Sequence, residues 1–339
     1  MTWRGQDEDD VRVRPGKGKK PRSKNRPSHD DAVPAMVTAV DRGRITCALV
    51  DGSETTVVAV KARELGRKAA VVGDRVQLVG DTSGTPDTLA RLVVIDERSS
   101  SLRRTADDND PYERIIVANA DQMGIVVAVA DPPPRVGLID RCLVAAYDSG
   151  VSPLLILTKT DLGDPTELLE LYRGLDVAAV GVHQDGDLRE LELLLGGKVT
   201  VLVGHSGVGK STLVNALLPD AERATGEVNE NTGRGRHTST SAIALPLHGA
   251  NGSRAAGAND GWIVDTPGFR SFGLAHVDRD QIVRTFADLA AGAEECPKNC
   301  SHDEEGCALD AVVARGDASA ERLESLRRIL AALSNDPGA

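Results

Sequence analysis

The sequence predicts three folded parts: a small β-barrel, a central α/β domain of the doubly wound class, and a short helical region with a metal site. Short β-rich runs separated by turn signals fill the first third of the chain. Strands of the buried type then alternate with helical segments. Near the C-terminus, three cysteines and one histidine lie within 12 residues. A chain of 339 residues is long enough for two or three domains.

Residues 1–34 are a basic tail in a chain that is acidic overall. The net charge of −11 argues against a protein that coats nucleic acid without selectivity. One stretch nevertheless contains eight basic residues and no acidic one, namely Arg12, Arg14, Lys17, Lys19, Lys20, Arg22, Lys24 and Arg26. This stretch has almost no apolar residues and is rich in Pro, Gly, Lys and Arg, which predicts disorder. Two interpretations remain open, an arm for RNA phosphates and a solvated tail that only aids solubility.

The start of the chain favours a cytoplasmic protein. The first ten residues, MTWRGQDEDD, lack the apolar core of a signal peptide. No apolar run approaches the roughly 18 residues that a membrane helix needs. We therefore expect no membrane insertion.

Residues 35–106 are predicted to form a small barrel, for which the OB-fold is a good candidate. Turns such as Asp51-Gly52 and Gly73-Asp74 separate five β-type runs, at 36–40, 45–50, 55–60, 75–79 and 89–95. A basic stretch at 61–68 accompanies them, without aromatic residues. This composition favours contact with the backbone of folded RNA over stacking on bases.

Residues 107–277 are predicted to form the doubly wound α/β domain. Near-continuous apolar runs at 115–118 and 123–129 are typical of strands buried on both faces of a parallel sheet. A helix is expected at 138–149. Further strands are expected at 154–157, 199–203 and 262–264. Ligands of such domains bind at the carboxyl edge of the sheet.

One segment fits the phosphate-loop pattern G-x-x-x-x-G-K-[ST] in full: Gly204-His205-Ser206-Gly207-Val208-Gly209-Lys210-Ser211. It follows the predicted strand 199–203 and precedes a predicted helix at 211–218, which is the setting that the motif requires. Glycines let backbone N–H groups converge on phosphate oxygens. We expect Lys210 to reach the β- and γ-phosphates and Ser211 to ligate Mg²⁺. Thr212 is assigned to the same nucleotide site.

A second segment, Thr158-Lys159-Thr160-Asp161, resembles the Asn-Lys-x-Asp box with which GTPases read guanine. The Asp161 carboxylate can only accept hydrogen bonds, and guanine offers it N1–H and the 2-amino group, whereas adenine offers neither there. Lys159 is expected to pack its stem along the base. Thr158 stands where the box has an asparagine that bonds the base and braces the phosphate loop, so weaker guanine binding is an open question.

The order of these motifs predicts a circularly permuted P-loop GTPase domain. The box lies about 45 residues before the phosphate loop, whereas an ordinary GTPase has the phosphate loop first. A segment like switch II, Asp265-Thr266-Pro267-Gly268, comes last. Asp265 would hold Mg²⁺ through water, and the Gly268 N–H would meet the γ-phosphate. Phe269 follows this glycine and cannot orient the attacking water as the glutamine of Ras-like enzymes does.

Switch I is predicted at Gly233-Arg234-Gly235-Arg236-His237-Thr238. Thr238 would bond Mg²⁺ and the γ-phosphate. His237 is the nearest candidate for positioning water, because its pKa suits that task. The alternative for His237 is a loop residue that contacts a partner. His237, Lys210 and Thr238 are thus the candidate catalytic residues.

Residues 278–339 are predicted to form a small helical zinc domain. Apolar residues at helical spacing indicate helices around 282–289 and 323–333. Between them lies a full tetrahedral ligand set for one structural Zn²⁺ per chain: Cys296, Cys300, His302 and Cys307. Because so small a domain has little core, the metal is expected to supply much of its folding free energy. Cys47 and Cys142 are predicted to be ordinary core residues.

Together these motifs resemble the RsgA family, the circularly permuted GTPases of small ribosomal subunit biogenesis. The resemblance covers about residues 35–330 and includes Ala118-Asn119-Ala120-Asp121-Gln122, Ile139-Asp140-Arg141 and Arg234-Gly235-Arg236-His237-Thr238. It implies an N-terminal OB domain, a central GTPase and a C-terminal zinc domain. It also implies GTP hydrolysis stimulated by the 30S subunit and its 16S rRNA, at a late step of maturation that ends in release of the protein. We expect a monomer.

Two other interpretations remain. The chain could be a GTP-sensing rRNA-binding module whose hydrolysis is incidental, which Phe269 and Thr158 favour. A permuted GTPase of the large subunit is the third, and the OB domain and zinc cluster speak against it. The stretch at 180–186 departs from the family's guanine-side loop, so that contact is left unassigned.

Overall fold

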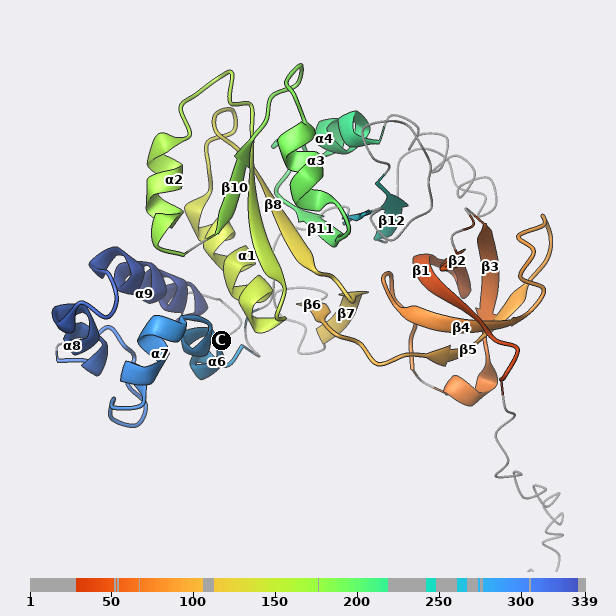
Figure 1. Cartoon of the computed structure of the whole chain (residues 1–339), viewed down its shortest axis with the longest axis horizontal. Coiled ribbons are helices and arrows are strands. Elements are labelled where there is room, and N and C mark those ends of the chain that lie inside the picture. Colours follow the sequence, from red (N-terminus) through yellow and green to blue (C-terminus); the bar gives the residue numbers. More distant parts are fainter. Residues whose placement is uncertain are drawn as a thin grey trace, which may run out of the picture. The chain divides into compact units, whose positions relative to one another are not determined.

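The computed structural model describes residues 29–105, 113–218, 242–247, 261–266, 274 and 277–334, apart from residues 52, 54, 67, 176 and 305. Figure 1 shows its helices and strands, most of them labelled. The described residues from Ala32 onward belong to one compact unit. Among the described helices, none is both long enough and apolar enough to cross a bilayer.

Five strands near the N-terminus close into a barrel with an apolar core of its own. They are β1 (Val33–Asp41), β2 (Arg44–Leu49), β3 (Thr56–Lys61), β4 (Arg75–Gly80) and β5 (Ala90–Ile95), with the short helix η2 (Arg63–Leu65) after β3. Pairing closes in the order β1-β2-β3-β5-β4 and back to β1. Val37, Leu78 and Leu92 are buried in its core. The five predicted runs are confirmed as strands of an OB-like barrel.

The next two strands form a separate hairpin. β6 (Ser101–Thr105) and β7 (Glu113–Ala118) pair antiparallel in a two-stranded sheet of their own. The prediction that the run 115–118 belongs to the parallel sheet is therefore wrong. An apolar run indicates a buried strand but does not identify its partner, and β6, with the sequence Ser-Leu-Arg-Arg-Thr, lacks the apolar content that would have marked it.

The central part of the main sheet has the order β10-β9-β8-β11-β13-β12, and β12 also pairs antiparallel with β1 of the barrel, through Ala39 and Ile243. Its strands are β8 (Gln122–Ala128), β9 (Ser152–Thr158), β10 (Ala178–Gly181), β11 (Val199–Val203), β12 (Ile243–Pro246) and β13 (Trp262–Asp265). All neighbours run parallel except β12, which is antiparallel to β13. Since parallel strands end at one edge, the segments that follow β8, β9, β11 and β13 share that edge.

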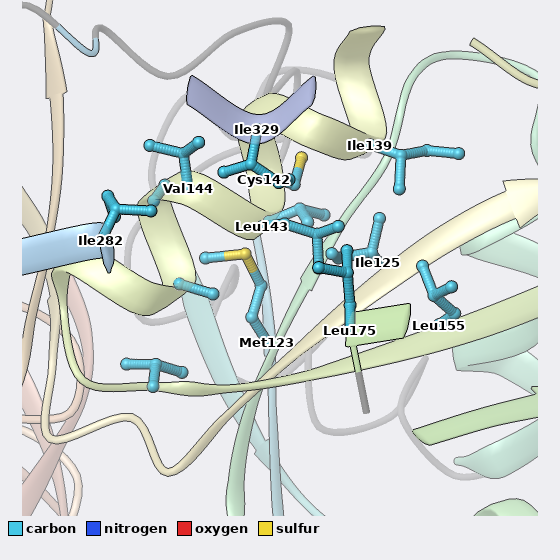
Figure 2. Packing of buried hydrophobic residues seen from close by; sticks show 14 of the residues in the cluster. Met123, Ile125, Ile139, Cys142, Leu143, Val144, Leu155, Leu175, Ile282 and Ile329 are labelled. Atoms are coloured by element: carbon cyan, nitrogen blue, oxygen red, sulfur yellow. The ribbon is translucent and has the colours of Figure 1, made fainter. Parts of the chain in front are cut away.

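Helices cover both faces of the central sheet, as predicted for a doubly wound domain. They are α1 (Val136–Asp148), α2 (Thr166–Tyr172), η3 (Arg173–Leu175), α3 (Arg189–Leu195) and α4 (Lys210–Leu217). Met123 and Ile125 of β8 pack with α1 on one face, and Figure 2 shows them beside Leu143. Val126 packs with α3 and α4 on the other. Burial on both faces explains why the strand is apolar at nearly every position.

Four helices end the described chain: α6 (Arg279–Thr285), α7 (Ala287–Ala293), α8 (Ala308–Arg315) and α9 (Ala320–Ser334). The single helix predicted around 282–289 is two helices, because Phe286 leaves helical geometry with φ −96° and ψ 75°. Ile282 of α6 and Ile329 of α9 belong to the same apolar cluster as Val144 of α1, as Figure 2 shows. The C-terminal helices therefore share the core of the central domain.

A partly buried ion pair joins α9 to α1. The Arg328 guanidinium lies 3.3 Å from the Asp140 carboxylate, with side chains 22% and 5% exposed. It also donates to the Leu171 carbonyl oxygen and lies over the Tyr172 ring, 4.8 Å from its centroid. Burial raises the pKa of Asp140, and the nearby Arg328 charge opposes that rise. This contact gives a role to Asp140, which the sequence singled out only within a motif.

Candidate functional site

The phosphate loop lies between β11 and α4, at the carboxyl edge of the central sheet. Gly209 is the N-cap residue of α4 and has φ +90°, a conformation that favours glycine. At Gly204 a Cβ atom would lie 2.6 Å from the Val126 carbonyl oxygen, so no side chain fits there. The loop therefore has the backbone geometry that lets N–H groups at the start of α4 face an anion.

Lys210 and Asp265 connect the phosphate loop to the end of β13. The Lys210 ammonium pairs with the Asp265 carboxylate and donates a second hydrogen bond, of 3.1 Å, to the Thr266 carbonyl oxygen. The Thr266 hydroxyl donates to the Leu202 carbonyl oxygen at 2.9 Å, which ties β13 to β11. Lys210 and Asp265, the residues predicted to contact the phosphates and Mg²⁺, therefore lie side by side at this edge.

The predicted guanine box meets the phosphate loop from the other side. Thr158 ends β9, and its hydroxyl lies 2.5 Å from the Val208 carbonyl oxygen, although the two residues are 50 positions apart. Lys159 has φ +57°, and its ammonium donates to the Asp131 carbonyl oxygen. Asp161, the predicted partner of the base, is exposed. β9 and β11 flank β8 and run parallel to it. The box that follows β9 and the phosphate loop that follows β11 therefore share one edge, although the box comes first in the chain.

The four predicted metal ligands converge at a second site. The Cys307 Sγ lies 3.6 Å from the Cys296 Sγ, 3.8 Å from the Cys300 Sγ and 3.7 Å from the His302 Nδ1. All four ligand atoms lie within 4.8 Å of one another. A tetrahedron with Zn–S bonds of about 2.3 Å has edges of about 3.8 Å. The spacing therefore fits a four-coordinate metal ion, with Nδ1 as the histidine ligand.

Arg327 and the N-terminal end of α8 hold the loop that carries these ligands. Cys307 is the N-cap residue of α8. Arg327 of α9 donates to the His302 carbonyl oxygen at 2.7 Å and to the Asp310 carboxylate at 2.9 Å. Burial lowers the pKa of His302, which favours the neutral ring that binds metals. Burial raises the pKa of the Cys307 thiol to about 12, so its thiolate needs a cation nearby.

Comparisons with known proteins show the family of this chain. The family model of the RsgA GTPase matches residues 95–275, more than half of the chain. A relative from Ectopseudomonas mendocina (strain ymp), named small ribosomal subunit biogenesis GTPase RsgA, is 39% identical over 278 residues, 79% of this chain and 76% of the relative. This chain belongs to the RsgA GTPase family. A protein of the same name from Chlorobaculum parvum is 33% identical and matches 90% of this chain and 99% of its own.

Solved structures support the fold. YjeQ from Thermotoga maritima has a TM-score of 0.65 and 25% identity, covering 90% of this chain and 99% of that one. YloQ, described as a circularly permuted GTPase, has a TM-score of 0.62 and 21% identity, covering 92% and 98%. The predicted fold class is confirmed, from the OB-like barrel and the permuted P-loop GTPase domain to the cysteine–histidine cluster in the C-terminal helices.

Several predicted RsgA site residues lie outside the described residues. They are His237, Thr238 and Gly268, together with Phe269, the arginines at 234 and 236, and the basic residues of the tail. Their roles remain predictions. Within the described part of the chain, Ser211 and Thr212 lie exposed in the first turn of α4. The other loop residues assigned to the nucleotide, His205, Ser206 and Gly207, lie between β11 and α4.

The turn after β8 contacts both the predicted guanine box and the phosphate loop, a neighbour that the sequence reasoning missed. Its Asp131 carbonyl oxygen accepts from Lys159, and Pro132 lies 3.7 Å from where a Cβ of Gly207 would stand. The run Asp131-Pro132-Pro133-Pro134 was the available signal, because a proline-rich turn at the end of a central strand reaches the ligand edge. The unassigned loop after β10 also approaches this edge, since its Val182 carbonyl oxygen accepts from the Thr160 N–H at 3.4 Å.

Proposed function

We propose that this chain binds Mg²⁺·GTP at the carboxyl edge of its central sheet and hydrolyses it to GDP and phosphate during maturation of the small ribosomal subunit. Hydrolysis would time a late step on the 30S particle and the release of the protein. The observation that carries the proposal is the meeting of Thr158, Lys210 and Asp265 at one edge, from segments in permuted order. The name shared by the relatives points to the small subunit.

The proposed nucleotide contacts follow from the chemistry of each residue. The phosphate loop, from Gly204 to Thr212, would surround the phosphates, and Asp161 would accept from guanine. Mg²⁺ would be held by the Ser211 and Thr238 hydroxyls and, through water, by Asp265. A bound Mg²⁺ offsets the charge that develops on the phosphate oxygens. His237 would orient the attacking water, and the Gly268 N–H would bond the γ-phosphate.

The remaining parts would serve ribosome binding. We propose boundaries at 35–106 for the barrel, 107–277 for the GTPase domain and 278–339 for the zinc domain. Barrel and basic tail (residues 1–34) would contact 16S rRNA through its phosphates. One Zn²⁺ per chain, on Cys296, Cys300, His302 and Cys307, would hold the ligand loop in shape. The protein would act as a monomer in the cytoplasm, where ribosomal subunits mature.

The decisive experiment is steady-state GTP hydrolysis without ribosomes, with purified 30S subunits and with purified 50S subunits. We expect strong stimulation by 30S alone and loss of stimulation in His237→Ala. Stimulation by 50S alone would contradict the assignment to the small subunit. If neither subunit raises the rate while GTP changes the affinity for 30S, the chain is a GTP-sensing rRNA-binding module, the second candidate that Phe269 supports.

A further inference from the structure

Thr158 has a single hydrogen to donate, and the structure shows where that hydrogen goes. Its side chain is buried, with 5% of the residue exposed. The hydroxyl lies 2.5 Å from the Val208 carbonyl oxygen and 3.3 Å from the Val127 carbonyl oxygen. Both neighbours are carbonyl groups, which only accept. The hydroxyl hydrogen is therefore used inside the protein, mainly at the closer oxygen in the phosphate loop.

The short contact to Val208 makes Thr158 a support of the phosphate loop. A Cβ built on Gly209 would lie 3.8 Å from the Thr158 Oγ1, so the threonine packs directly against the loop. Val208 itself is fully buried, which leaves water little access to this hydrogen bond. The bond thus links the end of β9 to the loop just before α4 begins.

An asparagine at this position could do more than threonine. Its side-chain amide has two N–H donors, so one can brace the loop while the other reaches the N7 acceptor of a purine. A threonine hydroxyl that already donates to Val208 has no second hydrogen for N7. The exchange of asparagine for threonine therefore separates two tasks, support of the phosphate loop and recognition of the base.

We propose that Thr158 is a positioning residue for the phosphate loop and makes no hydrogen bond to the purine, so that this chain reads guanine through Asp161 and makes no hydrogen bond to N7. The inference rests on the proposed function, because it concerns the same nucleotide site. It predicts that a guanine nucleotide without N7 binds as well as an ordinary one.

The test compares the dissociation constants of GDP and 7-deaza-GDP, in which carbon replaces N7. Diphosphates are used so that hydrolysis does not disturb the equilibrium, and calorimetry measures binding to the full chain. The wild-type protein should bind both within about twofold. Thr158→Asn should bind GDP about three- to tenfold more tightly than 7-deaza-GDP, the factor expected for one added hydrogen bond.

Two further variants separate support of the loop from reading of the base. Thr158→Val keeps the shape but loses the hydroxyl, so it should weaken both nucleotides equally, by about three- to tenfold. Thr158→Ser keeps the hydroxyl and should stay close to the wild-type protein. The far-UV spectrum and the melting temperature of each variant show whether it is folded.

The wild-type protein alone can overturn the proposal. A preference for GDP over 7-deaza-GDP of more than about threefold would mean that N7 is contacted. If Thr158→Val removed that preference, the hydroxyl would be the group that reads N7. If the preference survived in Thr158→Val, another group would read N7, and the proposal would fail in that way. Absence of binding for both nucleotides would instead refute the proposed function, and the inference with it.

Discussion

The nucleotide edge (Thr158, Val208, Lys210 and Asp265) and the metal-ligand loop (residues 294–307) both gather polar groups, but they rest on different supports. The nucleotide edge stands on strands whose two faces are covered by separate apolar clusters. The described residues of the metal-ligand loop form no helix or strand, and its buried residues are the ligands His302 and Cys307. Substitutions should therefore affect binding at the first site and local folding at the second.

The helices on either side of the metal-ligand loop, unlike the loop itself, are supported by the apolar core. Leu309 of α8, Leu289 of α7 and Leu326 of α9 are fully buried in the cluster that also contains α1. The expectation that zinc supplies much of the folding free energy of the whole C-terminal region therefore applies to the loop more than to the helices. Removal of the metal should open the loop and leave α9 packed on α1.

The largest expected effect is loss of the metal. Cys300→Ser should lower zinc content from one ion per chain to none, because structural zinc in peptides is held with about 10–16 kcal/mol of apparent free energy, which depends on every ligand. Amide exchange should rise across the metal-ligand loop and stay slow in α9. Metal analysis and hydrogen-exchange mass spectrometry measure both.

Cys47→Ala is the matched control for this variant, since it removes a buried thiol from the barrel. It should retain one zinc ion per chain. Retention of zinc by Cys300→Ser would refute the assigned ligand set, and fast exchange in α9 of the same variant would contradict the shared core.

The next largest effect is a loss of GTP hydrolysis with little change in stability. Lys210→Ala should lower the rate of GTP hydrolysis by about 10²–10³-fold, the usual loss when a charge-stabilising donor is removed. Its unfolding free energy should change by less than about 1 kcal/mol, because Asp265 is 34% exposed and can be hydrated. Single-turnover hydrolysis and urea unfolding test the two parts.

Lys198→Ala serves as the control, because Lys198 precedes β11 and its ammonium donates to the Leu194 carbonyl oxygen, away from the nucleotide edge. Hydrolysis should be unchanged in this variant. A large loss of stability in Lys210→Ala would contradict the expectation that substitutions at the nucleotide edge affect binding and not folding.

The smallest expected effect is on stability, and it comes from the ion pair of Arg328 and Asp140, outside both regions. Arg328→Met should lower the unfolding free energy by about 2 kcal/mol, less than for a fully buried pair because Arg328 is 22% exposed. Without the arginine, burial raises the pKa of Asp140 further. Protonation then stabilises the folded state, and this contribution is lost as the pH rises through the folded-state pKa.

The destabilisation in Arg328→Met should therefore be larger at pH 8 than at pH 5, which urea unfolding at both pH values measures. Arg173→Met breaks an exposed pair with Glu170 and should change stability by less than about 0.5 kcal/mol. A loss in Arg328→Met that does not grow with pH would show that the contact acts through packing and not through the charge of Asp140.

Pattern and motif were enough to predict most of this fold. The strand 199–203 and the phosphate loop after it were found because glycine spacing and an apolar run describe a local structure. The hairpin partner of β7 was missed, since β6 is polar and pairing is not local. The break at Phe286 was also missed, because an apolar residue at helical spacing does not reveal its backbone angles.

In the candidate sites, too, local patterns could be predicted from the sequence and long-range contacts could not. The four metal ligands lie within 12 residues, so their spacing indicated the cluster. The sequence showed that Thr158 departs from asparagine, but not that its hydroxyl donates to Val208, 50 positions away. The ion pair between Asp140 and Arg328 joins residues 188 positions apart, and no local pattern announces such a contact.

The central claim is that a box upstream of the phosphate loop reads guanine, and the most direct measurement is the nucleotide preference of Asp161→Asn. Xanthine carries a carbonyl where guanine has its 2-amino group, and the asparagine amide can donate to it. Competition between GTP and XTP for the variant should favour XTP by at least about tenfold, whereas the wild-type protein should favour GTP. An Asp161→Asn variant that keeps the wild-type preference for GTP would contradict the account.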